Sequence, residues 1–314
     1  MSSKHPIVAV TGASGAGTTV VKKAFRNIFL REGIQAAYID GDCFRRYDRV
    51  EMQAAKKEAE AKGKVLSHYG PDVNRFDDLE KLFRKYSETG TGTFHRYVNR
   101  TLAEEAGKEE GTFTDWENIP QTSDLLFYEG LHGGVVASHW TRREMSPSHN
   151  PSVIYERRNT EENSGVDAAQ YVDLLLGVVP VVNLEWIQKI SKDTDLKGHS
   201  HEEVTNQIVK RMQDYIHFIV PQFSVTDINF QRVPIVDTSN PFIAGEIPKS
   251  SEVITVIRFR EPKKYDFPYL LRMIDGAVMS RPNTMVIPGG EMKQALDVIC
   301  TPLIHDLVQN KKTG

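Results

Sequence analysis

Residues 12–19, GASGAGTT, have the composition and spacing of a loop that wraps phosphate oxygens. The phosphate-binding pattern is G-x-x-x-x-G-K-[ST]; Gly12, Gly17 and Thr19 satisfy it, whereas Thr18 stands at the lysine position. Glycines let backbone N–H groups turn toward an anion, and the start of a following helix favours negative charge. A Gly-rich turn that only joins a strand to a helix is the alternative, but the pattern favours phosphate binding with Thr19 as a Mg²⁺ ligand. The expected phosphate-binding residues are Gly12, Ala13, Ser14, Gly15, Ala16, Gly17, Thr18 and Thr19.

Two carboxylates follow apolar runs that have the character of buried strands. Asp42 comes shortly after AAYID (36–40), and Glu129 lies at the end of LLFYEG (125–130). Sites in α/β proteins form at the carboxyl ends of the strands. There Asp42 could accept a proton from a substrate hydroxyl, or it could cap the next helix, and the residues alone leave both open. Glu129 is placed like the acidic residue that holds Mg²⁺ in nucleotide-binding proteins.

A charged segment, NLEWIQKISKDTDLKGHS (183–200), could supply the cation that Thr18 does not. Helical spacing puts Lys189, Lys192 and Asp193 on one face. A charge run of this kind is more often only a solvated helix face.

Strands and helices alternate along the chain, which indicates an α/β fold with a mostly parallel sheet covered on both faces. Strands are predicted at 7–10, 36–40, 125–130, 174–182, 233–237, 253–259 and 284–289. Helices are predicted at 18–32, 50–62, 76–89, 184–193, 201–220 and 291–309. We expect one domain over residues 1–314, with an extended surface loop at 139–165 and a frayed tail at 310–314.

Composition indicates an ordinary globular protein, with 39% hydrophobic and 26% charged residues and a net charge of −3. That charge predicts no nucleic-acid or membrane partner, and no apolar run reaches the length of a membrane span. The N-terminus shows no signal peptide. Two cysteines, Cys43 and Cys300, argue against a disulfide framework and fit the cytoplasm.

Six motifs in order along the chain resemble phosphoribulokinase of the bacterial type. They are GASGAGTT, GDCFRRYDR (41–49), FYEGLHGG (127–134), VVPVVNLEWIQKI (178–190), PQFSVTDINFQRVPIVDTSNPF (221–242) and IRFRE (257–261). The resemblance implies a P-loop kinase fold, in which ATP and Mg²⁺ phosphorylate the 1-hydroxyl of ribulose 5-phosphate to give ribulose 1,5-bisphosphate. Bacterial members share the lysine-free loop, so Thr18 is a family trait.

The resemblance also implies roles for individual residues. Asp42 is the expected catalytic base, Lys189 the replacement for the loop lysine, and Asp193 a second essential carboxylate and metal ligand beside Thr19 and Glu129. Arg31 matches an arginine that binds an effector such as NADH or AMP, and the family forms octamers. Arg258 or Arg260 is a further effector candidate. The expected substrate-binding residues are Arg49, Tyr97, His132, Lys192 and Lys197.

The chain departs from the family mainly around the sugar. Lysines at 192 and 197 replace arginines, which changes a planar fork into a point charge. Arg45 replaces a histidine, Asn99 replaces a histidine that contacts the sugar phosphate, and His95 stands at a usually basic place. A uridine-kinase-like enzyme for another acceptor and a non-catalytic nucleotide-binding regulator therefore remain alternatives. Cys43, beside Asp42, could be alkylated or could be a small buried hydrophobe.

Overall fold

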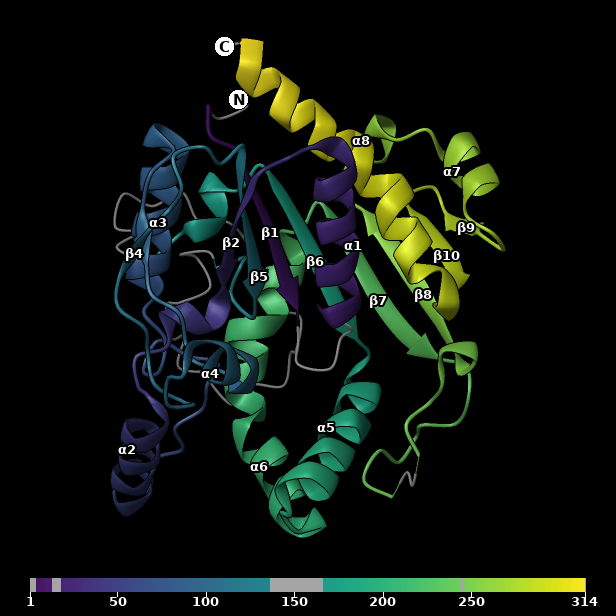
Figure 1. The fold of residues 1–314 in the computed structure, drawn as a ribbon. Helices are drawn as coiled ribbons and strands as arrows, with labels where there is room; N and C mark the ends of the chain where they lie inside the picture. Colours follow the sequence, from purple (N-terminus) through teal and green to yellow (C-terminus); the bar gives the residue numbers. More distant parts are fainter. Residues whose placement is uncertain (1–3, 13–17, 136–165, 244–245, 314) are drawn as a thin grey trace, which may run out of the picture.

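A computed structural model describes residues 4–12, 18–135, 166–243 and 246–313 (Figure 1). One eight-stranded sheet lies at the centre, with strand order β2-β5-β1-β6-β7-β8-β10-β9. The strands from β2 to β7 are parallel, whereas β8, β10 and β9 each run antiparallel to their neighbour. The predicted α/β class, with a mostly parallel mixed sheet and helices on both faces, is confirmed.

The strands are β1 (Ile7–Gly12), β2 (Ala36–Asp40), β3 (Thr93–Phe94), β4 (Glu117–Asn118), β5 (Leu125–Gly130), β6 (Leu174–Pro180), β7 (Ile228–Pro234), β8 (Val253–Phe259), β9 (Val278–Arg281) and β10 (Thr284–Pro288). The α-helices are α1 (Thr18–Glu32), α2 (Arg49–Ala61), α3 (Phe76–Thr89), α4 (Arg100–Ala106), α5 (Val182–Lys197), α6 (His201–Asp214), α7 (Phe267–Met273) and α8 (Met292–Thr313). Strands β3 and β4 pair with each other as a separate antiparallel ribbon.

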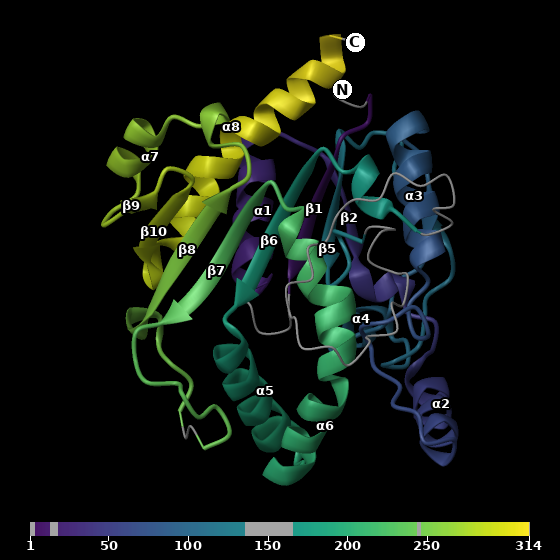
Figure 2. The ribbon, with the colours of Figure 1, turned by 180° about the vertical axis from the view of Figure 1, so that it is seen from behind.

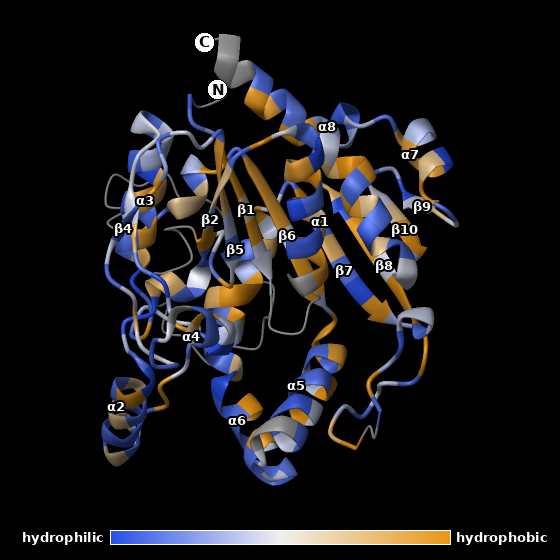
Figure 3. Ribbon diagram, in the orientation of Figure 1, coloured by the Kyte–Doolittle hydropathy of each residue, from blue (hydrophilic) through white to orange (hydrophobic). Residues whose placement is uncertain are grey.

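The central strands are apolar throughout because both faces of the sheet are covered. Every residue of β1 and β6 is buried. Helices α1 and α8 cover the face seen in Figure 1, and α3 and the segment that follows α6 cover the other face (Figure 2). The orange strands between partly blue helices in Figure 3 show this layering. The α1 face predicted from Val21, Phe25, Ile28 and Phe29 is at most 2% exposed and is therefore confirmed.

Some predicted elements differ from the structure. The strand expected at 233–237 is instead β7, whose alternating burial gives no continuous apolar run, and residues 235–237 are exposed. Strand β9 and helices α4 and α7 were not predicted. The tail expected to fray is helical to Thr313, and the extended loop expected at 139–165 lies outside the described residues. No helix in the described part of the chain is long and apolar enough to cross a bilayer.

Helices α5 and α6 form a hairpin that extends beyond the carboxyl ends of the parallel strands, and we call it the lid (Figures 1 and 2). The helix expected at 201–220 is α6 followed by a π-helical turn, Tyr215–Ile219, and a 3₁₀ turn, Val220–Ser224. We call residues 215–224 the stem. Stem residue Gln222 is 1% exposed and accepts hydrogen bonds from Thr11 Oγ1 and the Gly134 backbone, both at 3.0 Å. The stem is thereby tied to the end of β1.

Candidate active site

The Gly-rich loop has the strand-to-helix context that its sequence predicts. Gly12 is the last residue of β1, and α1 begins at Thr18. Ala13, Ser14, Gly15, Ala16 and Gly17 lie outside the described residues. Phosphate binding by this loop, and Mg²⁺ ligation by Thr19, therefore stay predictions.

Asp42 lies in a 3₁₀ turn, Gly41–Phe44, directly after β2. The side chain of Asp40 caps this turn by accepting from the Asp42 backbone N–H at 3.0 Å, and Asp48 caps α2. The interpretation of Asp42 as a helix cap is therefore wrong, and its carboxylate is left available for chemistry. About half of that side chain, 49%, is exposed. Burial of the remainder raises the pKa of Asp42, and the guanidinium of Arg45 opposes the rise.

Arg45 joins Asp42 to the aromatic residues of the neighbouring segment. Its Nη2 and Nε atoms lie 2.8 and 3.0 Å from Asp42 Oδ1. The guanidinium also lies over the Tyr97 ring, 4.5 Å from the centroid, which is a cation–π contact. Tyr97 is thus placed beside the expected base, as a substrate-binding residue would be. The role of Arg45 here was not predicted, because its partner is nearby only in the folded turn.

Arg49 and Asn99 both have protein partners. Arg49 begins α2 and donates to Glu110 at 2.5 Å, with 51% of its side chain exposed. Asn99 caps α4 by accepting from the Leu102 backbone N–H at 3.0 Å. The residue that replaces the family's histidine therefore has a local structural role.

Glu129 and Asp40 are paired residues at the ends of β5 and β2. Lys22, from the second turn of α1, lies between them, 3.7 Å from Asp40 Oδ2 and 3.9 Å from Glu129 Oε2. Sequence reasoning missed Lys22, although its position one helical turn after Thr18 was an available signal. Carboxylate oxygens are ligands that Mg²⁺ prefers, so this strand edge has donors that fit the metal.

The described residues contain no cluster of three or more His, Cys, Asp or Glu side chains arranged for a metal ion. Asp193, the other predicted carboxylate ligand, belongs to the lid instead of the strand edge. The ligand set Thr19, Glu129 and Asp193 stays a prediction.

Lys189 and Asp193 form an ion pair within α5, with Nζ and Oδ2 separated by 2.7 Å. Asp193 is buried and Lys189 is mostly buried, whereas Lys192 is exposed. Lys197 is the last residue of α5, and its side chain is not among those described. The lid therefore brings Lys189 and Asp193 together.

A buried polar contact that the sequence did not reveal joins the lid to the stem. Tyr215 donates to Glu185 Oε2 at 2.8 Å, and burial raises the pKa of Glu185 to about 7. A further contact joins Ser67 to Asp214 at 2.5 Å. The lid is thus connected both to the stem and to the segment around Ser67.

His132 is packed inside the protein. It is 5% exposed, and its Nε2 donates to the Tyr69 carbonyl at 3.0 Å. Its ring meets the edge of Phe76 at 4.7 Å, and burial lowers its pKa to about 4. This arrangement is that of a packed histidine and gives the predicted substrate contact no support.

Cys43 is 4% exposed, and burial raises the pKa of its thiol to about 12. The thiol is the unreactive form at neutral pH. Cys43 therefore behaves as a small buried hydrophobe and not as a site of alkylation.

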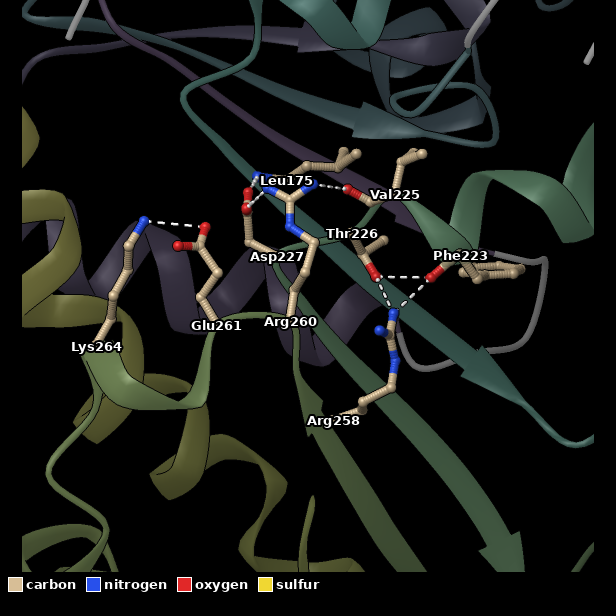
Figure 4. A network of polar contacts seen from close by, with 9 residues as sticks. All are labelled: Leu175, Phe223, Val225, Thr226, Asp227, Arg258, Arg260, Glu261 and Lys264. Carbon is tan, nitrogen blue, oxygen red and sulfur yellow. Dashed lines mark hydrogen bonds and ion pairs between the residues drawn. The ribbon is translucent and has the colours of Figure 1, made fainter. Parts of the chain in front are cut away.

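The candidate effector arginines all have protein partners. Arg31 donates to Asp297 at 2.9 Å and to Thr301 at 2.8 Å on α8. Arg258 donates to the Phe223 carbonyl at 2.8 Å, and Arg260 pairs with Asp227 (Figure 4). Arg258, but not Arg260, lines a cavity of about 570 Å³ that lies between Val182, the first residue of α5, and strand β8.

Comparisons with known proteins identify the family of the chain. The model of the phosphoribulokinase / uridine kinase family matches residues 7–146 and 153–239. The plasmid phosphoribulokinase of Cupriavidus necator is 51% identical over 316 residues, which cover 99% of each chain. Phosphoribulokinase 1 of Cereibacter sphaeroides is 48% identical over 316 residues and all of both chains. The solved structure of phosphoribulokinase from Rhodobacter spheroides has a TM-score of 0.83 at 47% identity, covering 98% of this chain and 99% of that one. The chain therefore belongs to the phosphoribulokinase / uridine kinase family.

Proposed function

We propose that this chain is a phosphoribulokinase, which transfers the γ-phosphoryl group of ATP to the 1-hydroxyl of ribulose 5-phosphate. The observation that carries the proposal is the position of Asp42, half exposed on a capped turn at the carboxyl edge of the sheet, where β1 also ends at Gly12. Full-length similarity to phosphoribulokinases supports this acceptor over a nucleoside.

In the proposed reaction, the Asp42 carboxylate accepts the proton of the 1-hydroxyl while that oxygen attacks the γ-phosphorus. The bond from the γ-phosphorus to the bridging oxygen breaks, and ADP leaves with the electron pair. Asp42 must exchange its contact with Arg45 for the substrate hydroxyl, which frees the guanidinium for a sugar-phosphate oxygen. Product ribulose 1,5-bisphosphate then departs, and Asp42 returns its proton to solvent.

The remaining residues bind and neutralise phosphate. The loop Gly12–Thr19 holds the ATP phosphates, and Lys189 supplies the cation that Thr18 lacks. Arg49, Tyr97, Lys192 and Lys197 bind ribulose 5-phosphate. Mg²⁺, held by Glu129 with Thr19 and Asp193, would neutralise negative charge on the transferring phosphoryl group.

We also propose the wider properties that the family suggests. Residues 1–314 form one kinase domain, because a single sheet extends from Ile7 to Pro288. Arg31 and Arg258 are the effector residues, for a ligand such as NADH or AMP, and the chain assembles as a homo-octamer. Two free, buried cysteines support the cytoplasm as its location.

The test is an ADP-coupled assay with ATP and Mg²⁺, supplied in turn with ribulose 5-phosphate, uridine and pantothenate. We expect turnover with ribulose 5-phosphate alone and a product whose mass is that of ribulose bisphosphate. Turnover only with another acceptor would identify a related kinase, and no turnover with tight ATP binding would identify a regulator. Asp42→Asn should lower kcat by roughly 10²–10⁴, with ATP affinity measured separately by calorimetry and unchanged.

A further inference from the structure

His95 lies between two aromatic rings next to the turn that carries Asp42. Its ring is stacked on Phe113 at 4.4 Å and 13°, and on Trp116 at 4.4 Å and 18°. The side chain is 7% exposed. Two nearly parallel neighbours restrict the plane of the imidazole, so the direction of its ring nitrogens is fixed.

The Nε2 atom of His95 lies 2.9 Å from the carbonyl oxygen of Cys43. A carbonyl can only accept, so Nε2 carries the hydrogen and the tautomer is defined. Burial lowers the pKa of His95, which keeps the ring neutral. Cys43 is the residue after Asp42, and this hydrogen bond holds the middle of the turn from outside.

The same aromatic group reaches Asp42 by a second route. Phe113, which stacks on His95, also meets the Tyr97 ring edge-on at 5.4 Å, and Tyr97 lies under the guanidinium of Arg45. Arg45 in turn binds the Asp42 carboxylate. The Cys43 backbone and the Asp42 side chain are therefore both held by one continuous set of packed aromatic and charged residues.

We propose that His95 is a positioning residue, which sets the place of Asp42 through the Cys43 carbonyl and acts only through that carboxylate. The proposal rests on the proposed role of Asp42 as the base. It explains why a neutral, stacked histidine can occupy a place where a basic side chain was expected, because this chain uses the position for a backbone hydrogen bond.

Two substitutions separate the hydrogen bond from the packing. His95→Phe keeps an aromatic ring in the stack but removes the donor. His95→Gln keeps a donor but removes the ring. Since a small misplacement of a reacting group can cost up to about 10²-fold in rate, we expect His95→Phe to lower kcat by about tenfold or more, with KM for ATP unchanged. His95→Gln should retain more kcat than His95→Phe, even where its melting temperature is lower. His305→Phe, at an exposed histidine of α8, is the control and should keep full activity.

The decisive measurement is a double-mutant cycle with Asp42→Asn. If His95 acts through Asp42, His95→Phe should cause no further loss of kcat in the Asp42→Asn protein. A loss of the same factor in both backgrounds would assign His95 to general stability and overturn the proposal. Full kcat in folded His95→Phe would overturn it as well. Full activity of Asp42→Asn alone would refute the base itself and, with it, the positioning role.

Should His95→Phe fail to fold, Trp116→Ala takes its place in the cycle, because it frees one face of the imidazole and leaves the donor present. A smaller loss of kcat that vanishes in the Asp42→Asn background supports the proposal. A loss that persists there contradicts it.

Discussion

The Nζ atom of Lys189 lies 2.7 Å from Oδ2 of Asp193, one turn further along α5. The lysine proposed to replace the loop cation is therefore paired with a carboxylate of its own helix. For Lys189 to stabilise a transferring phosphoryl group, Asp193 must exchange the ammonium for another cation, and a Mg²⁺ ion that accompanies ATP is the natural candidate.

Lys189→Ala should lower kcat by about a hundredfold, because removing a preorganised group from a transition state commonly costs roughly 3 kcal/mol. Lys210→Ala, on the exposed side of α6, is the matched lid control and should have normal kcat. Thr18→Lys should recover part of the activity in the Lys189→Ala protein but give no gain in the intact protein, where two ammonium groups would repel. Additive effects across the four variants, measured by steady-state kinetics, would show that the two positions do not share one task.

Arg45→Met should move the acidic limb of the kcat/KM profile to higher pH. Arg45 lowers the pKa of Asp42 against the effect of burial, so its removal raises that pKa and the base is lost at a higher pH as the solution is acidified. Arg46→Met is the neighbouring control, since Arg46 is exposed and its guanidinium donates to the Pro71 carbonyl at 3.4 Å. An unchanged limb in Arg45→Met would mean that Asp42 does not govern it.

Glu185→Gln should stabilise the protein at pH 8 more than at pH 5. The folded-state pKa of Glu185 is about 7, above its ordinary value of 4.5. The folded chain therefore holds an extra proton between these values, and wild-type stability falls as the pH rises through them. Glutamine stays neutral and still accepts from Tyr215. We expect a gain in melting temperature of a few degrees at pH 8, measured by calorimetry, with exposed Glu202→Gln as control. An equal gain at both pH values would contradict the assignment.

Glu129→Gln should raise the Mg²⁺ concentration needed for half-maximal activity by about tenfold or more. The amide removes one of the two carboxylates that flank Lys22 and leaves the shape of the strand end intact. Binding of Mg²⁺ followed by calorimetry in the presence of ATP gives a readout that does not depend on turnover. The surface variant Glu58→Gln should match the wild type. An unaltered Mg²⁺ requirement in Glu129→Gln would show that Glu129 does not bind the metal.

The apolar pattern of the chain predicted the sheet well, because a strand covered on both faces must be apolar along its whole length. Strand β7 was predicted at the wrong residues for the same reason. Its burial alternates, and the run VPIVD that overlaps its end is more apolar than the strand itself. Asp42 and Glu129 could be located because strand ends meet at one edge. The contacts of Arg45 with Tyr97 and of Glu185 with Tyr215 could not be predicted in the same way, because these partners belong to separate elements that meet only in the fold.

The π-helical turn Tyr215–Ile219 sets how α6 is rotated about its own axis relative to α5. A residue in an α-helix advances the direction of the helix by about 100°, so the number of residues in the stem decides which side of α6 faces α5. The hydrogen bond from Thr11 to Gln222 fixes one end of the stem to β1, and the hydrogen bond from Tyr215 to Glu185 fixes its other end to α5. Chain length is therefore under tighter constraint in the stem than side-chain identity. Deletion of one residue would turn the side of α6 that faces α5 away from it, whereas many substitutions at the exposed positions would leave the direction of α6 unchanged.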